Sequence, residues 1–148
     1  MNSFFDSLLQ NKILVVTFFG WLIAQTIKVL LGVIREKRFD FRWFIGTGGM
    51  PSAHASGVTA LAMTSGLNVG FDSPIFAIAV VFAFVTMFDA QGVRRATGDQ
   101  AEILNKIVDD LYRGRKVGEN RLKELIGHTP IEVITGAIVG LFVALAFQ

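Results

Sequence analysis

The stretch GTGGMPSAHASGVTALAMTSGLNVG, residues 46–70, decides how this chain folds. It carries no charged residue, and its larger part, 52–70, is rich in alanine, glycine, serine and threonine. Side chains this small suit close packing between helices better than contact with lipid. The stretch therefore predicts a short helix over about 52–70 that packs against other helices and is preceded by a flexible glycine-rich turn.

Three further apolar stretches are long enough to cross a bilayer, which takes roughly 20 residues. They are residues 13–34, with one internal lysine, 73–93 and 130–148. Hydrophobic residues make up 52% of the chain and charged residues 18%, which is more apolar than an ordinary soluble domain. No stretch has the polar stripe of a surface helix, which argues against the alternative of a soluble bundle. We predict one all-α domain over 1–148, an integral membrane bundle of about four transmembrane helices.

Positive charge is concentrated in two connections. The first follows the first span and carries Arg35, Lys37, Arg38 and Arg42; the second, 94–128, carries eight lysines and arginines. The N-terminal twelve residues and the turn 68–73 contain one basic residue between them, Lys12. Because basic loops mark the cytoplasmic side, we predict a multi-pass protein of the inner (plasma) membrane with both termini outside.

The second connection has a pattern of its own. Leu104, Ile107, Val108 and Leu111 share one face of the segment 99–112, which predicts an amphipathic helix at the membrane interface or over the site. Residues 121–127 are expected to form a short helix that ends at a glycine. The chain has no cysteine, which excludes disulfides and thiolate chemistry, and its net charge of +2 is too small to indicate a nucleic-acid partner.

The two histidines of the chain, His54 and His128, occur in matching places. Ser52 is a suitable N-cap, so His54 falls in the first turn of its helix. Thr129 can cap the last span with Pro130 in its first position, and His128 stands just before that cap. Helix N-termini bind anions, so a phosphate is expected between the two helix starts, on the cytoplasmic side. A single histidine near a helix end is more often only a polar interfacial residue; the repeated context favours a site.

Charged residues within the apolar spans extend the candidate site. Lys28 and Arg35 are seven residues apart, on nearly the same helix face and about 10 Å apart along the axis. Lys28 is expected to face the bundle interior, with snorkelling to the interface as the alternative. Asp89 precedes Arg94 and Arg95 by about one turn, which makes a local ion pair plausible.

In combination, these residues resemble the type 2 phosphatidic acid phosphatases, relatives of the vanadium haloperoxidases. Lys28-VLLGVI-Arg35 has the spacing of that family's first motif, with glutamate instead of the following proline. Pro51-Ser52-Ala53-His54 matches the second motif with alanine for glycine. His128-TPI-Glu132 matches the end of the third motif with glutamate for aspartate, and the serine–arginine half is missing. The chain looks like a divergent branch of small bacterial membrane proteins, over about residues 25–140.

The resemblance implies roles for individual residues. His128 would be the nucleophile that forms a phosphohistidine, Glu132 would hold its other ring nitrogen, and His54 would protonate the leaving oxygen. Glu132 has a structural alternative, because Thr129-x-x-Glu132 is also a capping box.

Further residues would surround the phosphate. Lys28, Arg35 and one more arginine would neutralise the phosphoryl oxygens. The better candidates for that arginine are Arg94 and Arg95, one of them oriented by Asp89, and Arg121 is the alternative. Ser52 and the N–H groups of Gly48 and Gly49 would complete the cradle.

The implied activity is hydrolysis of a phosphoric monoester or diphosphate on a membrane lipid, without a metal or other cofactor. The alternatives are a non-catalytic protein that binds or transports a lipid phosphate in the same pocket, and a structural membrane subunit. Typical relatives have six helices, so a homodimer is a further expectation, through the small-residue faces of the spans 52–70 and 130–148.

Overall fold

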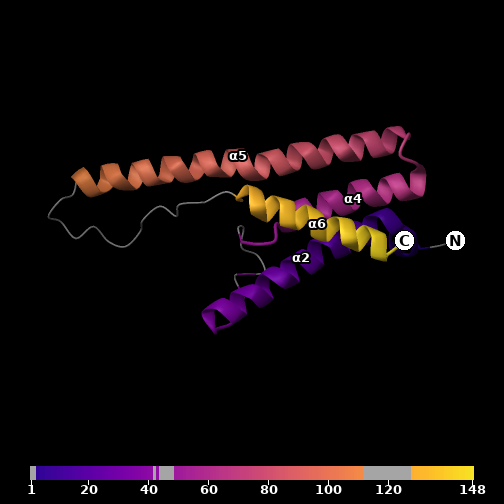
Figure 1. The fold of residues 1–148 in the computed structure, drawn as a ribbon, viewed down its shortest axis with the longest axis horizontal. Helices are drawn as coiled ribbons and strands as arrows, with labels where there is room; N and C mark the ends of the chain where they lie inside the picture. The colour runs from indigo at the N-terminus through magenta and orange to yellow at the C-terminus, as the bar shows by residue number, and fades with distance from the viewer. Residues whose placement is uncertain (1–2, 42, 44–48, 112–127) are drawn as a thin grey trace.

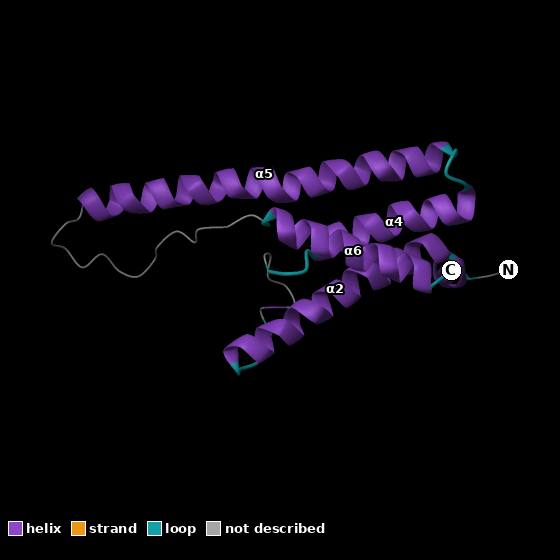
Figure 2. Ribbon diagram, viewed as in Figure 1, coloured by secondary structure: helices purple, strands orange, loops and turns teal. Residues whose placement is uncertain are grey.

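The computed structural model describes residues 3–41, 43, 49–111 and 128–148, and within these ranges the secondary structure is helical, with no strand (Figure 2). The helices are α1 (Phe4–Gln10), α2 (Lys12–Glu36), α4 (Ala53–Val69), α5 (Pro74–Leu111) and α6 (Pro130–Ala146). The predicted all-α fold class is confirmed, and three of the four predicted spans agree closely with α2, α4 and α6.

The helix starts follow from local sequence. The Ser52 hydroxyl accepts a hydrogen bond from the Ala55 N–H at 3.4 Å and so caps α4. Thr129 caps α6 in the same way, and Glu132 completes a capping box. Each cap satisfies N–H groups that the first helical turn leaves without an intrahelical partner. Both predicted caps are confirmed.

Helix α4 lies in the middle of the bundle and packs on α2, α5 and α6. Helices α2 and α5 run in one direction and α4 and α6 in the other (Figure 1). The chain ends and the turn between α4 and α5 therefore lie at one end of the bundle, and the starts of α4 and α6 lie at the other.

Small residues bring α4 into backbone contact with its neighbours. A Cβ atom on Gly136 or Gly140 of α6 would overlap the main-chain carbonyl of Ser52 or Ser56, respectively. On the opposite side, the Ser56 hydroxyl donates to the Gly20 carbonyl of α2 at 2.7 Å. The small-residue faces that we expected to permit a homodimer are thus used within one chain, since no side chain separates the helices there. The homodimer itself stays a prediction.

The outer surface of the bundle is apolar, as lipid contact requires. Two described helical segments, Lys12–Glu36 and Pro74–Gln91, are long and apolar enough to cross a membrane. Helices α4 and α6 have 17 residues each, at the lower limit for a span, so the count of four spans stays a prediction. Large exposed apolar residues lie on α2, α5 and α6, among them Phe18, Ile34, Ile78, Phe84, Phe88, Ile134 and Phe142.

The third predicted span is longer than expected. The segment 99–112, predicted as a separate amphipathic helix, is helical as far as Leu111, but it continues α5 without a break from Pro74 (Figure 1). Gly92 and Gly98 cost about 1 kcal/mol of helix propensity each, which is too little to end a long helix that contains no internal proline. The predicted helix over 121–127 lies outside the described residues.

Candidate functional site

The two histidines, which are 74 positions apart, lie together at the end of the bundle where α4 and α6 begin. Their ring centroids are 6.1 Å apart, and the ring planes meet at 62°. His54, in the first turn of α4, is exposed, whereas His128 is only 4% exposed. One ring is therefore accessible from outside while the other is held inside the bundle.

Main-chain hydrogen bonds fix the helix starts relative to each other. The Ser52 N–H donates to the Glu132 carbonyl at 2.9 Å, which joins the start of α4 to the first turn of α6. The His128 N–H donates to the Ala90 carbonyl of α5 at 3.1 Å. Because these bonds join three helices at one level, the backbone holds the two histidines on neighbouring helix starts.

Glu132 orients the buried imidazole. Its Oε2 atom lies 3.0 Å from His128 Nδ1 and accepts the Thr129 N–H at 3.0 Å. An ionised carboxylate only accepts hydrogen bonds, so Nδ1 is the donor, and in the neutral ring Nε2 keeps its lone pair. The capping role and the ring-holding role, which sequence left as alternatives for Glu132, are performed by the same oxygen atom.

The other nitrogen of the buried ring, His128 Nε2, is buried and makes no hydrogen bond within the part of the chain that the structure describes. An unsatisfied buried polar atom costs roughly 1–3 kcal/mol, and most such atoms in proteins are paired. An atom left in this state next to a second imidazole is typical of a site that acts on a ligand.

Lys28 of α2 contacts the glycine turn that precedes α4. Its Nζ donates to Gln25 Oε1 at 3.0 Å, and a Cβ atom on Gly49 would lie 3.4 Å from its Cγ. Gly49 has a φ of +84°, which favours glycine, so the turn passes close to the lysine stem. Lys28 is half-buried, which agrees with the predicted interior placement better than with snorkelling.

Gln25 is a residue that the sequence analysis missed. It is 3% exposed, accepts from Lys28 and donates from Nε2 to the Trp43 carbonyl at 2.8 Å. It therefore connects the lysine of α2 to the chain segment that leads to the glycine turn. The available signal was a polar residue inside an apolar span, three positions before Lys28, because such residues are rare there unless they have partners.

The remaining predicted site residues fall into three groups. Ser52 is fully buried, and its hydroxyl and N–H both hold α4 in place. Arg35 and Asp89 are exposed, Arg35 in the last turn of α2 and Asp89 next to the Ala90 carbonyl that His128 binds. Gly48 and Arg121 lie outside the described residues. Arg94 and Arg95 belong to α5, but their side chains are also outside the described part of the structure.

Comparison with known proteins identifies the family of the chain. Residues 9–143 match the Divergent PAP2 family. The chain is similar to the uncharacterized membrane protein YuiD of Bacillus subtilis (strain 168), with 41% identity over 149 residues that cover 93% of this chain and 94% of that protein. No solved structure gives a significant match. The family match over most of the chain and the 41% identity to a membrane protein together show that the chain belongs to the divergent PAP2 family of membrane proteins.

Proposed function

We propose that this protein is an integral membrane phosphatase that hydrolyses the phosphate ester of a lipid through a phosphohistidine intermediate. The observation that carries the proposal is the histidine pair: His54 lies 6.1 Å from His128, whose Nδ1 is bound to Glu132 and whose Nε2 is unpartnered among the described residues. A nucleophile, the group that orients it and a candidate proton donor are thus within the reach of one phosphoryl group.

In the first step, the lone pair of His128 Nε2 attacks phosphorus, and the bond from phosphorus to the lipid oxygen breaks. Protonated His54 gives its proton to that oxygen, so the lipid leaves as an alcohol. The Glu132 carboxylate stabilises the positive charge that develops on the attacking ring, because it holds Nδ1–H at 3.0 Å.

In the second step, water attacks the phosphohistidine and the phosphorus–nitrogen bond breaks. His54, now neutral, takes a proton from the water, so inorganic phosphate is released and both imidazoles return to their starting states. We assign Lys28, Arg35 and the positive end of the α4 helix dipole to the charge on the phosphoryl oxygens, since cations and helix N-termini stabilise such charge.

A second candidate is a non-catalytic protein that binds or transports a lipid phosphate in the same pocket. The observation that favours it is the missing serine–arginine half of the third motif, which leaves the site with fewer assigned cations. Binding without release of phosphate would distinguish this candidate from the phosphatase.

The direct test is phosphate release by purified protein from phosphatidic acid, phosphatidylglycerophosphate and polyprenyl phosphates and diphosphates in mixed micelles. We expect turnover of at least one lipid, unchanged by a chelator, and acid-labile phosphate on the protein after rapid quenching. Absence of turnover on the whole panel contradicts the phosphatase. Turnover that the chelator abolishes contradicts the proposed metal-independent mechanism.

We also propose that the site faces the cytoplasm, because the connections at that end of the bundle carry most of the positive charge. The chain contains no cysteine, so single cysteines report accessibility without a background. In intact cells, an impermeant maleimide is expected to label Asp72→Cys, in the turn between α4 and α5. Arg38→Cys, after α2, should react only after permeabilisation. The reverse pattern would place the site outside.

A further inference from the structure

An apolar groove of about 420 Å³ starts at His54 and lies between α2 and α5. Its walls include Phe18 and Trp21 from α2 and Phe82 from α5, and its floor is α4 at Gly57 and Val58. This volume lies within the usual range for small-molecule sites, roughly 300–1,000 Å³.

The groove exists because the two helices that flank it do not meet. Within the described ranges, α2 and α5 both pack on α4 but not on each other. Gly57 deepens the gap, since a Cβ atom there would be 3.5 Å from Trp21 Cβ, in ordinary contact, and a longer side chain would extend into the groove. The flanking segments are also the two that are long and apolar enough to cross a membrane, so the groove opens toward lipid.

Apart from the His54 imidazole and the Trp21 indole N–H, the only polar side-chain groups in the described lining are two hydroxyls. Its two hydroxyl groups, on Thr17 and Thr86, donate to the carbonyls of Ile13 and Phe82 in their own helices, at 2.7 and 2.8 Å. These bonds satisfy the hydroxyls locally, so the walls offer hydrocarbon contact with one ionisable group, His54, in the lining. Such a surface fits an amphiphile with an anionic end and an apolar chain.

The groove leads away from the histidine pair along the bundle. On α5, the Ala90 carbonyl binds the His128 N–H, and Thr86 and Phe82 follow one and two turns farther back. On α2, the lining extends from Trp21 back to Leu14, a length of about 10 Å at 1.5 Å per residue. The whole hydrocarbon core is about 30 Å thick, and one leaflet is half of it, so the groove covers a large part of one leaflet.

We propose that this groove holds the hydrocarbon chain of the phosphate ester whose head group lies at His54 and His128, an inference that rests on the proposed function. The groove therefore selects a long-chain lipid phosphate over a short or water-soluble one. Because lipid tails in the bilayer are as apolar as the groove, the selection comes from fit and from positioning of the head group.

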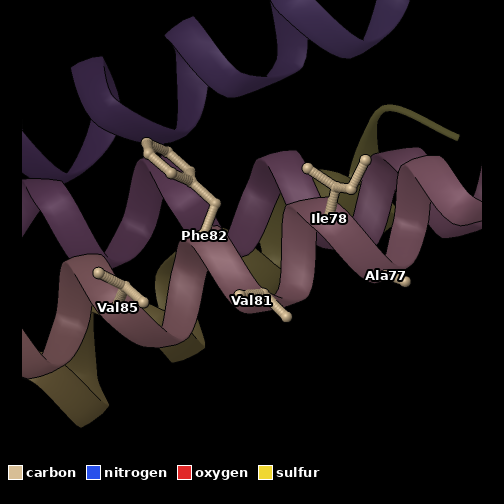
Figure 3. Close-up of a pocket in the computed structure, with 5 residues that line it drawn as sticks. All are labelled: Ala77, Ile78, Val81, Phe82 and Val85. Carbon is tan, nitrogen blue, oxygen red and sulfur yellow. The ribbon is translucent and has the colours of Figure 1, made fainter.

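A second apolar groove on α5 provides the control. It is lined by Ala77, Ile78, Val81, Phe82 and Val85, none of which is a site residue (Figure 3). Phe82 belongs to both grooves, and its ring points toward α2. Ala77 belongs only to the second groove, so Ala77→Leu fills apolar space on the same helix without obstructing the path from His54.

The experiment compares hexadecyl phosphate with butyl phosphate as substrates for wild type, Gly57→Leu, Thr86→Phe and Ala77→Leu. The two variants in the first groove act from different helices, so misfolding of one leaves the other as a test. We expect each to lower kcat/KM for hexadecyl phosphate about 10-fold or more, within the range of 10–200-fold that small misfits in apolar pockets produce. The kcat/KM of these two variants for butyl phosphate should change less than about 2-fold. Ala77→Leu should leave kcat/KM unchanged for both substrates. Equal losses on both substrates, or no loss, would overturn the groove assignment.

A binding measurement keeps the two proposals separate. Hexadecyl phosphate with a diazirine at mid-chain is expected to crosslink wild type within residues 14–21 and 82–86, and Gly57→Leu much less. Phosphatidylcholine with the same diazirine should not label these residues preferentially; equal labelling means that any bilayer lipid fills the groove and overturns the inference. If no phosphate is hydrolysed but the crosslink appears as expected, the proposed catalysis fails and the groove assignment stands.

Discussion

A His128→Asn variant is expected to lose phosphate release from the lipid substrate by about 10⁴-fold or more, while it still binds that lipid. The asparagine amide can donate to Glu132 as Nδ1 does at 3.0 Å, so the start of α6 is preserved, but the attacking nitrogen is gone. Loss of a nucleophile has effects of this size because the covalent route is removed altogether. Phosphate release, lipid binding and acid-labile protein phosphate are measured on the same preparation.

The matched variant is His54→Asn, because the two imidazoles have different tasks. General acid catalysis contributes about 10²–10⁴-fold, and it matters most when the leaving group is a poor one. His54→Asn should therefore slow formation of the phosphoenzyme from the alkyl ester by that factor and from p-nitrophenyl phosphate far less. Because His54 also takes the proton from water in the second step, the phosphoenzyme formed from p-nitrophenyl phosphate should accumulate in this variant. His128→Asn should lose hydrolysis of both substrates and should form no phosphoenzyme. If His128→Asn hydrolyses lipid at a normal rate, or if the two variants behave alike on both substrates, the assigned roles are wrong.

The parts of the fold that sequence predicts well are those fixed by short-range chemistry. The caps at Ser52 and Thr129 need only a hydroxyl followed by a helical turn, and both were predictable from neighbouring residues. The proximity of His54 and His128 was predictable in outline, because helices joined across the membrane return both starts to one end.

Features that depend on contacts between distant segments were not predictable. Gln25 resembles any polar residue on an apolar helix until the fold places Trp43 and Lys28 beside it. The small residues of α4 and α6 indicate close packing but not which helix is the partner, so their contact with each other within one chain could not be read from sequence. The continuation of α5 to Leu111 is a similar case, since a change from apolar to amphipathic composition does not require the helix to end.

The packing of α6 on α4 leads to the prediction with the largest effect on stability. Gly140→Ala is expected to destabilise the bundle by about 3 kcal/mol, at the upper end of the usual cost of overpacking. The added Cβ atom would overlap the main-chain carbonyl of Ser56, and a backbone cannot move aside as a flexible side chain can. On the scaling of globular domains of similar size, this corresponds to a fall in Tm of roughly 6–12 °C. Thermal unfolding in micelles, followed by circular dichroism of the helices, measures it.

The matched control is Gly57→Ala on α4, which is expected to stabilise the bundle rather than destabilise it. An alanine Cβ at this position would lie 3.5 Å from Trp21 Cβ and 3.9 Å from the Thr17 carbonyl, so it fits without displacing either. Replacing a helical glycine without strain stabilises by about 0.4–1 kcal/mol, mainly through the unfolded state. Because both substitutions add one methyl group to a helical glycine, their difference isolates the backbone contact between α4 and α6. If the two variants melt at the same temperature, α6 does not lie against α4 at Gly140, and the hydrogen bond that aligns Ser52 with Glu132 loses its structural basis.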